Sequence, residues 1–447
     1  MMNRIFGRRA RRVSFRTNLD QLRVSFWFTP LVMSVAAILL VQILYAIDAR
    51  IPNEILAKSR FFLAGDPVGI RTLLFGMATT TLATAGVVFS LLTLPLSTVA
   101  AQFGSRLLRI YLRDRTTQIV LGMFSATFCF CLSAAFLIPP VAEFGDLPQV
   151  TVSFALLLFL ATFASLIALI QHISTALQAP NIVAGAATEL RSVIKSHISE
   201  DGDADIPPAQ RTIPAGLQED QGYEIQASTT GYVQSIDPYS ILHLAEAAGL
   251  VIQLFRKPGK FVRPGDRLAL VWPAGQVEDE VASRIRHTFQ IGNQRTPTQD
   301  VEYAVNQLVE VGVRAMSPAI NDPFTAMTCL DQLGAGLALF VERGGPPSNY
   351  YDSNGDIRLI FEPASLSELL EASFAMFRHA SRDNAAVLGR MLDAIVAINR
   401  KVQRDDQRAD LLRHVDLILV ESQSGNLIEA DKAMLRSRCE DLAELLR

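Results

Sequence analysis

Cysteine and histidine are scarce in this sequence, which has four cysteines and six histidines among 447 residues. The cysteines (Cys129, Cys131, Cys329 and Cys439) are too few and too scattered for a disulfide framework, and a reducing compartment suits them. The histidines lack the spacing of a metal site. We also find no Walker-type loop, no dinucleotide fingerprint, no zinc-protease motif and no nucleophile elbow. We therefore expect no catalytic residue, no metal and no cofactor.

Charge is missing from four long apolar stretches in the first third of the chain. They are residues 26–47, 72–94, 118–138 and 151–171, and none contains Asp, Glu, Lys, Arg or His. At about 1.5 Å rise per residue, each can cross a hydrocarbon core of roughly 30 Å as a helix. The first is too long for the core of a signal peptide, so we interpret it as a retained anchor. The absence of ionisable residues argues against a proton-coupled pump.

Basic residues are concentrated in alternate connecting segments. Seven arginines precede the first stretch and four lie in residues 95–117, whereas residues 139–150 have none. Residues 48–71 carry mixed charge and do not decide the orientation. Because Lys and Arg favour the cytoplasmic side of short loops, we expect both termini in the cytoplasm.

The second stretch is rich in small and hydroxyl residues. Gly76, Thr80 and Thr84 recur at every fourth position. Such a face packs helices closely, with threonine hydroxyls bonded to their own backbone, or it lines a polar membrane path in a homo-oligomer. Both interpretations remain open at this point.

The remainder of the chain is acidic, with 26 basic and 37 acidic residues after Gln171. This balance argues against non-specific binding of nucleic acid. The predicted fold is an α-helical membrane protein with four transmembrane helices, followed by a cytoplasmic α+β region made of a small β-module and a helical bundle. The predicted domains are a basic arm (1–25), a transmembrane domain (26–171), a helix with an acidic, proline-containing linker (172–222), the β-module (223–275) and a mostly helical domain (276–447).

The β-module is predicted from three strand-like runs, GYVQSI, LVIQLF and RLALVW. Pro258-Gly259 and Pro264-Gly265 indicate type II turns, because the glycine accepts a positive φ. The order of these runs resembles the sandwich of lipoyl and biotinyl carrier domains. Lys257 and Lys260 flank a Pro-Gly pair and lack the context of a modified carrier lysine. We therefore expect a structural or ligand-binding module without a covalent cofactor.

Residues 292–331 form the most densely specified stretch of the soluble part. Thr296 as N-cap and Gln299 as its capping-box partner predict a helix that begins at Pro297. Pro318 ends that helix, and Asp322 caps the next one. A capping box at Ser365 predicts a later helix after a loop and a short strand (343–356 and 357–361), and further helices are predicted at 385–404, 406–421 and 426–447.

Eight polar residues of this central stretch are candidates for a ligand or coupling site: Arg295, Thr296, Asp300, Arg314, Ser317, Asn321, Asp322 and Thr325. Arg295 and Arg314 lie beside Asp300 and Asp322, where arginine forms bidentate pairs with carboxylates. The alternative is that these residues only cap helices and fix the corner between them.

The run RAMSPAINDPFTA, from Arg314 to Ala326, with RTPTQD ahead of it, resembles the signature of a bacterial family of predicted membrane proteins, domain-of-unknown-function family 2254. The resemblance covers nearly the whole chain and implies location in the bacterial inner membrane. It implies no activity. Three classes of function remain, with the lipid bilayer as partner and the ligand unknown: an oligomeric channel-like protein gated by its cytoplasmic domain, a membrane-anchored sensor or scaffold, and a membrane-bound enzyme.

Overall fold

The computed structural model describes residues 27–50, 66–103, 114–138, 148–176, 178–198, 217–352 and 354–447. The chain divides into two compact units, unit 1 (residues 1–181) and unit 2 (residues 182–447). The predicted basic arm, residues 199–216 of the predicted linker and most of the loop arginines lie outside the described residues.

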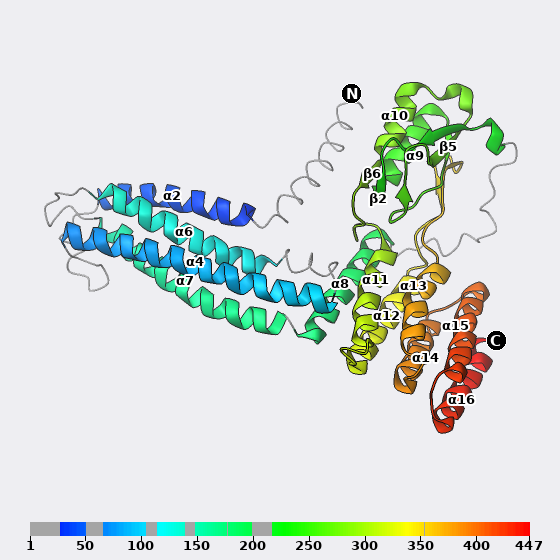
Figure 1. The fold of residues 1–447 in the computed structure, drawn as a ribbon. Helices are drawn as coiled ribbons and strands as arrows, with labels where there is room; N and C mark the ends of the chain where they lie inside the picture. The colour runs from blue at the N-terminus through cyan, green and yellow to red at the C-terminus, as the bar shows by residue number, and fades with distance from the viewer. Residues whose placement is uncertain are drawn as a thin grey trace. The chain divides into compact units, whose positions relative to one another are not determined.

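Unit 1 consists of long apolar helices, one for each uncharged stretch of the sequence. They are α2 (Phe28–Asp48), α4 (Pro67–Phe103), α6 (Arg115–Leu137) and α7 (Gln149–Ala176). They lie side by side in Figure 1, and α6 contacts the other three. Val41, Leu74 and Phe130 are fully buried at their common core. Among the described residues, five helices are long and apolar enough to cross a membrane, these four and α12 (Pro323–Glu342) of unit 2.

Polar side chains join the helices of unit 1 near both ends of α7. Asp48, the last residue of α2, accepts hydrogen bonds from the backbone N–H groups of Val150 and Thr151, at 2.8 and 2.9 Å. Asp114, the N-cap of α6, lies 2.9 Å from Nε2 of His172 near the other end of α7. These contacts make α7 antiparallel to both α2 and α6. An acidic side chain at a helix N-terminus satisfies N–H groups that have no partner within the helix.

Unit 2 contains helix α8 (Ala179–His197) from Ile182 onward, eight strands and a series of helices. The strands are β1 (Tyr223–Gln226), β2 (Gly231–Ile236), β3 (Val251–Leu254), β4 (Phe261–Val262), β5 (Arg267–Trp272), β6 (Phe289–Gly292), β7 (Asn349–Tyr351) and β8 (Ile357–Phe361). The helices are α9 (Pro238–Ala248), α10 (Asp279–His287), α11 (Val301–Ala315), α12, α13 (Leu366–Ala380), α14 (Ala385–Asn399), α15 (Asp405–Ser424) and α16 (Glu429–Leu446), with short 3₁₀ turns η2 (Glu219–Gln221) and η3 (Ala274–Gln276).

The strands form two sheets, with five strands in the order β1-β5-β3-β8-β7 and three in the order β4-β2-β6. β8 runs parallel to β3, with Ile252 opposite Leu359, and the other pairs are antiparallel. Three of these strands, β6, β7 and β8, lie beyond residue 275, and β7 lies within the predicted loop 343–356. The chain therefore returns to the sheet after it has formed α11 and α12.

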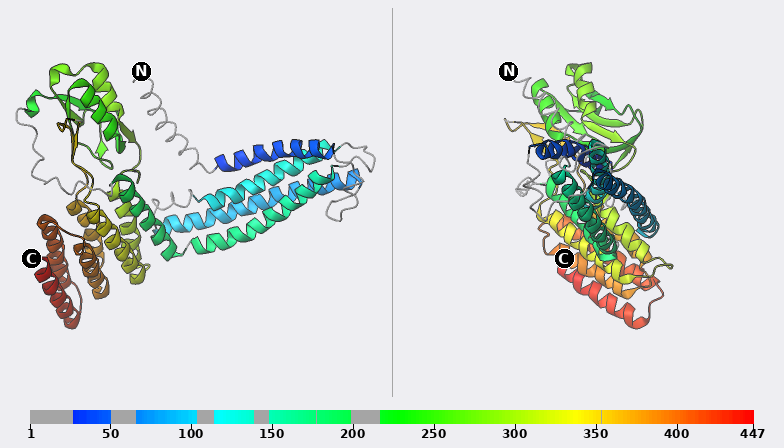
Figure 2. Two further views of the ribbon diagram at one scale, coloured as in Figure 1. Left: turned by 180° about the vertical axis from the view of Figure 1, so that it is seen from behind. Right: turned by 90° about the vertical axis from the view of Figure 1, so that its left-hand side faces the viewer.

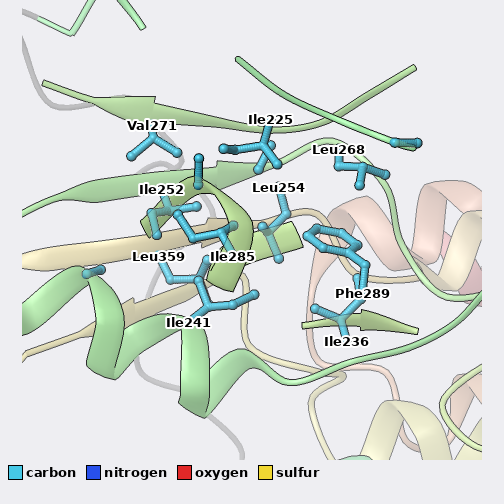
Figure 3. Close-up of a cluster of buried hydrophobic side chains, with 14 of the residues drawn as sticks. Ile225, Ile236, Ile241, Ile252, Leu254, Leu268, Val271, Ile285, Phe289 and Leu359 are labelled. Atoms are coloured by element: carbon cyan, nitrogen blue, oxygen red, sulfur yellow. The ribbon is translucent and has the colours of Figure 1, made fainter. Parts of the chain in front are cut away.

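The core of the β-module lies between the sheets and the helices α9 and α10. Ile225, Ile241, Ile252 and Ile285 point toward one another in Figure 3 and are fully buried. Every second side chain of a short strand points into this core, which agrees with the strands predicted from the β-rich runs of the sequence. Gly259 and Gly265 have φ of +91° and +89°, which confirms the predicted positive φ in both Pro-Gly turns.

The helices from α11 to α16 form two rows. α11, α13 and α15 contact one another in order, and so do α12, α14 and α16. In both views of Figure 2 these helices, coloured from yellow-green to red, follow one another in order of sequence. The predicted capping box of α13 is present, because Ser365 and Glu368 each accept a hydrogen bond from the other's backbone N–H. The helix predicted from Pro297 begins instead at Val301, which corrects that prediction.

Candidate functional site

The N-terminal end of α11 carries a buried ion pair. Asp300 is the N-cap of α11 and accepts a hydrogen bond from the N–H of Tyr303 at 2.9 Å. The guanidinium of Arg295 donates to both carboxylate oxygens of Asp300, from Nε at 2.8 Å and from Nη2 at 2.9 Å. The Asp300 side chain is only 2% exposed. Such a bidentate pair fixes both side chains in one geometry, and the sequence predicted it for Arg295.

This pair belongs to a larger charged network. Glu302 lies 3.2 Å from Arg295 and 3.5 Å from Nζ of Lys260, which belongs to the loop between β3 and β4. Burial raises the pKa of Asp300, and this effect outweighs the hydrogen bonds from Arg295 and Tyr303 that lower it. Asp300 therefore lies where water screens charge poorly, and the Lys260–Glu302 pair attaches the loop to the first turn of α11.

The predicted capping box at Thr296 does not form. Gln299 bonds the backbone of Ile236 on β2 instead, accepting from its N–H at 2.8 Å and donating to its carbonyl at 2.9 Å. The Thr296 hydroxyl is buried without a hydrogen-bond partner among the described residues. Asp300 replaces Thr296 as the cap, because a carboxylate held by Arg295 is a stronger acceptor for the first N–H groups of the helix.

The C-terminal end of α11 carries the other candidate residues, at the corner before α12. Asp322 caps α12 by accepting from the Thr325 N–H at 3.1 Å and from its hydroxyl at 2.5 Å, and the latter bond lowers the pKa of Asp322. Asn321 has a left-handed φ of +49°. Backbone N–H groups of Ile320 and Asn321 donate to the carbonyl of Ser317, at 3.0 and 2.9 Å. The predicted cap of α12 is confirmed.

Arg314 contacts Glu310 one turn earlier on α11, at 3.2 Å. Its side chain is 42% exposed. This is an i, i+4 pair on the helix surface, and it differs from the bidentate pair with Asp322 that the sequence suggested at the corner. Hydrophobic side chains at the same corner also face solvent, since Ile320 is 45% and Phe324 is 75% exposed.

The eight candidate residues therefore fall into two groups. Arg295, Thr296 and Asp300 lie at one end of α11, and the other five lie at its far end. The helix has 15 residues, so the groups are separated by roughly 20 Å. A single ligand-sized site does not contain both groups. A ligand-binding role remains a prediction for each group separately.

The candidate polar membrane face lies on α4. Thr80 is exposed, and the Thr84 hydroxyl donates to the Thr80 carbonyl at 2.8 Å. Thr79, Thr81 and Ser90 likewise donate to carbonyls one turn earlier. Backbone bonding of these hydroxyls was one of the two interpretations of the sequence, and the structure contains it.

A hollow of about 420 Å³ lies on the β-module, and Lys260, the partner of Glu302, is one of its lining residues. Its lining residues are Leu254, Phe255, Arg256, Lys257, Lys260, Phe261, Arg263, Asp266 and Glu362. The sequence reasoning missed it, although four cations within eight residues were visible in the run RKPGKFVR. In the described ranges, no group of three His, Cys, Asp or Glu side chains is arranged to hold a metal ion.

The sequence as a whole matches a known protein family. The sequence matches the family described as "Predicted membrane protein (DUF2254)" over residues 23–397, which include α2, the β-module, the corner and most of α14. The chain belongs to this family. The family membership that the sequence suggested is thereby confirmed, and the protein is a predicted membrane protein with several apolar helices.

Relatives of this family member carry no assigned activity in their descriptions. "Uncharacterized protein Mb1321c" of Mycobacterium bovis is 27% identical over 382 residues, which cover 84% of this chain and 72% of the relative. "Uncharacterized protein Rv1290c" of Mycobacterium tuberculosis matches to the same extent. No solved structure matches the chain. The resemblance of the β-module to carrier domains therefore remains a prediction.

Proposed function

We propose that this protein is a multi-pass inner-membrane protein in which α2, α4, α6 and α7 are the spans and unit 2 is cytoplasmic. The uncharged stretches and the distribution of loop arginines support this topology. Alkaline phosphatase fusions should be active only within residues 48–71 and 139–150. Phosphatase activity of a fusion after Arg447 would contradict the cytoplasmic C-terminus.

The fifth apolar helix, α12, belongs in this proposal to the core of unit 2. Leu330, Leu333 and Leu337 are fully buried, and α12 contacts α11, α13 and α14. Its Gln332 also accepts a hydrogen bond from Arg191 of α8 at 2.8 Å. A helix that is apolar on several faces is expected in the interior of a helical bundle as well as in a membrane.

The observation that carries the functional proposal is a face of small residues on α4 that no described part of the chain covers. Its members, spaced at three and four residues and all exposed, are Thr72, Gly76, Thr79, Ala83, Gly86 and Ser90. Side chains added at Gly76 or Gly86 would meet no described atom within 4 Å. In membranes, such faces let a neighbouring helix approach closely. A second copy of the chain supplies the matching face, so we propose a homo-oligomer assembled through α4.

Assembly around α4 gathers hydroxyl groups from several copies at the centre of the oligomer. A polar path without ionisable residues follows, which suits a channel-like protein better than a proton-coupled pump. Unit 2 is the gating domain in this proposal, since α8 begins within three residues of the end of α7. The protein is thus a channel-like oligomer gated by its cytoplasmic domain.

A membrane-anchored sensor or scaffold is the second candidate. The observation that favours it is the hydrogen bonding of the α4 hydroxyls to their own backbone, which leaves them without need of pore water. In that case the membrane spans attach unit 2 to the bilayer and conduct no ions.

Recording and cross-linking of purified full-length protein separate the candidates. In a background without the four native cysteines, Gly76→Cys should form disulfide dimers, whereas Leu82→Cys on another exposed face should not. The protein should give discrete conductance in planar bilayers, and Gly76→Leu should abolish it by blocking close approach of α4. Cross-linking without conductance would favour the scaffold. Absence of cross-linking at Gly76 would contradict the proposed homo-oligomer.

A further inference from the structure

The hollow on the β-module carries an excess of positive charge. Arg256, Lys257, Lys260 and Arg263 line it together with two acids, Asp266 and Glu362. Like charges so close together, on the two turns that flank β4, repel one another, so the fold must hold them in place or compensate them. The compensation differs between the lysines and the arginines.

Both lysines are held by carboxylates outside the hollow. Lys257 donates to both oxygens of Glu368, in the capping box of α13, at 2.7 and 2.6 Å. Lys260 lies 3.5 Å from Glu302, in the first turn of α11. The loop is thereby attached to two helices, and the Pro258-Gly259 turn restricts its backbone further. The wall of the hollow is fixed before any ligand arrives, which reduces the entropy lost on binding.

Both arginines lack such compensation. Within the described part of the chain, no carboxylate lies at ion-pair distance from Arg256 or Arg263. Nε of Arg256 is buried without a hydrogen-bond partner. The Asp266 carboxylate accepts the backbone N–H of Arg263 at 2.9 Å, not its guanidinium. The half-buried Arg256 guanidinium therefore keeps a buried donor that is costly unless an anion supplies the missing acceptor. Arg263 is exposed and lies over the Phe261 ring, 5.7 Å from its centroid, so its donors can turn to the same anion.

We propose that this hollow binds a small organic phosphate, with Arg256 and Arg263 as the phosphate ligands. The planar guanidinium presents several N–H donors in a geometry that matches phosphate oxygens. The hollow is within the range of roughly 300–1,000 Å³ that small-molecule sites occupy, which leaves room for an organic group beside the phosphate. Glu362 accepts a hydrogen bond from a hydroxyl of that group, and partly exposed Phe261 offers it an apolar wall. The same chemistry is available in a soluble phosphate ester or in a lipid headgroup.

The proposal concerns unit 2 and does not depend on whether the protein conducts. Binding is measured by isothermal titration of full-length protein in a phosphate-free, non-ionic detergent. The probes are glycerol 3-phosphate and AMP, with glycerol and adenosine as their phosphate-free counterparts. Either phosphate should bind, and its counterpart should not. Lipid as the source is tested with nanodiscs of phosphatidylcholine, with and without phosphatidylglycerol.

The matched variants separate the hollow from general surface charge. The double variant Arg256→Gln/Arg263→Gln should weaken phosphate binding about ten- to hundredfold, because it removes two charge-assisted contacts. Arg284→Gln removes an exposed arginine from α10 on the same module, outside the hollow, and should leave affinity unchanged. If only phosphatidylglycerol nanodiscs protect Arg256 and Arg263 from phenylglyoxal, the phosphate ligand is a lipid headgroup.

Two results overturn the proposal. One is equal affinity of the wild type and a folded double variant for every phosphate probe. The other is absence of binding in detergent together with absence of protection in either kind of nanodisc. If the double variant fails to unfold cooperatively, phenylglyoxal modification of the wild type decides instead. Modification of Arg256 and Arg263, but not of Arg284, should slow in the presence of glycerol 3-phosphate or AMP, and equal rates would contradict the assignment.

Discussion

The backbone of Gly259 lies directly against the carboxylate of Asp300. A Cβ added at Gly259 would overlap that carboxylate and the guanidinium of Arg295. Gly259 also has a φ of +91°, which residues with a side chain rarely adopt. The turn between β3 and β4 is therefore closely packed on the ion pair at the start of α11.

Gly259→Ala should destabilise unit 2 more than Gly265→Ala does. Both glycines have nearly the same φ, so both variants incur a backbone cost of about 1–2 kcal/mol. A Cβ at Gly265 meets no described atom within 4 Å, whereas one at Gly259 displaces Arg295 or Asp300. We expect an additional loss of about 2 kcal/mol in the free energy of unfolding for Gly259→Ala. Equal losses in denaturant titrations would show that the turn does not press on the ion pair.

Arg295→Lys should cost about 2 kcal/mol of unfolding free energy. Lysine keeps the charge but loses the planar two-point contact, so the buried Asp300 carboxylate keeps the Tyr303 N–H and one charged donor in place of two bonds from a guanidinium. Arg314→Lys is the matched control, since Arg314 is 42% exposed and pairs with Glu310 along the helix. Its effect should be a few tenths of a kcal/mol. Thermal unfolding in detergent compares the two variants, and a larger effect of Arg314→Lys would show that Arg314, not Arg295, makes the more demanding contact.

Helix caps and tight turns could be predicted from the sequence, because the residues that determine them are close together in the chain. The caps at Asp322 and Ser365 and the positive φ of both Pro-Gly turns are set within three or four residues, and the structure contains them. The box at Thr296 failed because Gln299 bonds Ile236, which lies 63 residues away. Pattern reasoning has no access to such a distant competitor. The parallel pairing of β8 with β3 is hidden for the same reason.

In the candidate site, too, contacts between residues close in the sequence could be predicted and contacts between distant residues could not. The bidentate pairing of Arg295 with Asp300 was predictable, because the residues are five positions apart and flank a helix start. The hollow was not predicted, because Lys257 and Lys260 were considered only as carrier lysines. Their partners, Glu368 and Glu302, are distant in sequence, so only the folded chain separates the compensated lysines from the uncompensated arginines.

Asp48→Asn should destabilise unit 1 by about 1–2 kcal/mol. Asp48 caps a different helix from its own, accepting from Val150 and Thr151 at the start of α7, and the asparagine loses the charge and one acceptor. Asp66→Asn is the control, because among the described residues the Asp66 carboxylate accepts a hydrogen bond from the nearby N–H of Gly69, within its own helix end. Its effect should be smaller. Denaturation in SDS titrations measures both, and equal effects would mean that Asp48 does not join α2 to α7.

Intact mass provides a test of the β-module. Lys257 bonds Glu368 and its side chain is 15% exposed, so the amine is poorly placed for modification. Protein made in a host supplied with lipoate and biotin should have its sequence mass after N-terminal processing. A lipoyl or biotinyl increment on Lys257 or Lys260 would show that the module is a carrier domain after all.

His414 gives unit 2 a specific dependence on pH. The imidazole is 1% exposed, lies edge-on to Phe374 and is next to Arg413. Burial lowers the pKa of His414 from 6.5 to about 4, with Arg413 adding to the effect. The unfolded chain binds the proton more tightly than the folded chain does. The free energy of unfolding is therefore highest above pH 6.5, where His414 is neutral in both states, and it decreases as the pH falls toward about 4.

Between pH 7 and pH 4, wild-type unit 2 should therefore lose about 3 kcal/mol more unfolding free energy than His414→Leu does, because leucine binds no proton. The comparison with the variant removes the contribution of carboxylates that titrate in the same range. Phe374→Leu is the packing control, since it changes the contact with His414 but keeps the titrating group. It should lower stability by about 1 kcal/mol at every pH and leave the slope unchanged. Denaturant titrations at a series of pH values measure all three proteins. If His414→Leu retained the wild-type slope, the acid sensitivity of unit 2 would arise from other groups, and the buried imidazole would titrate alike in the folded and unfolded chains.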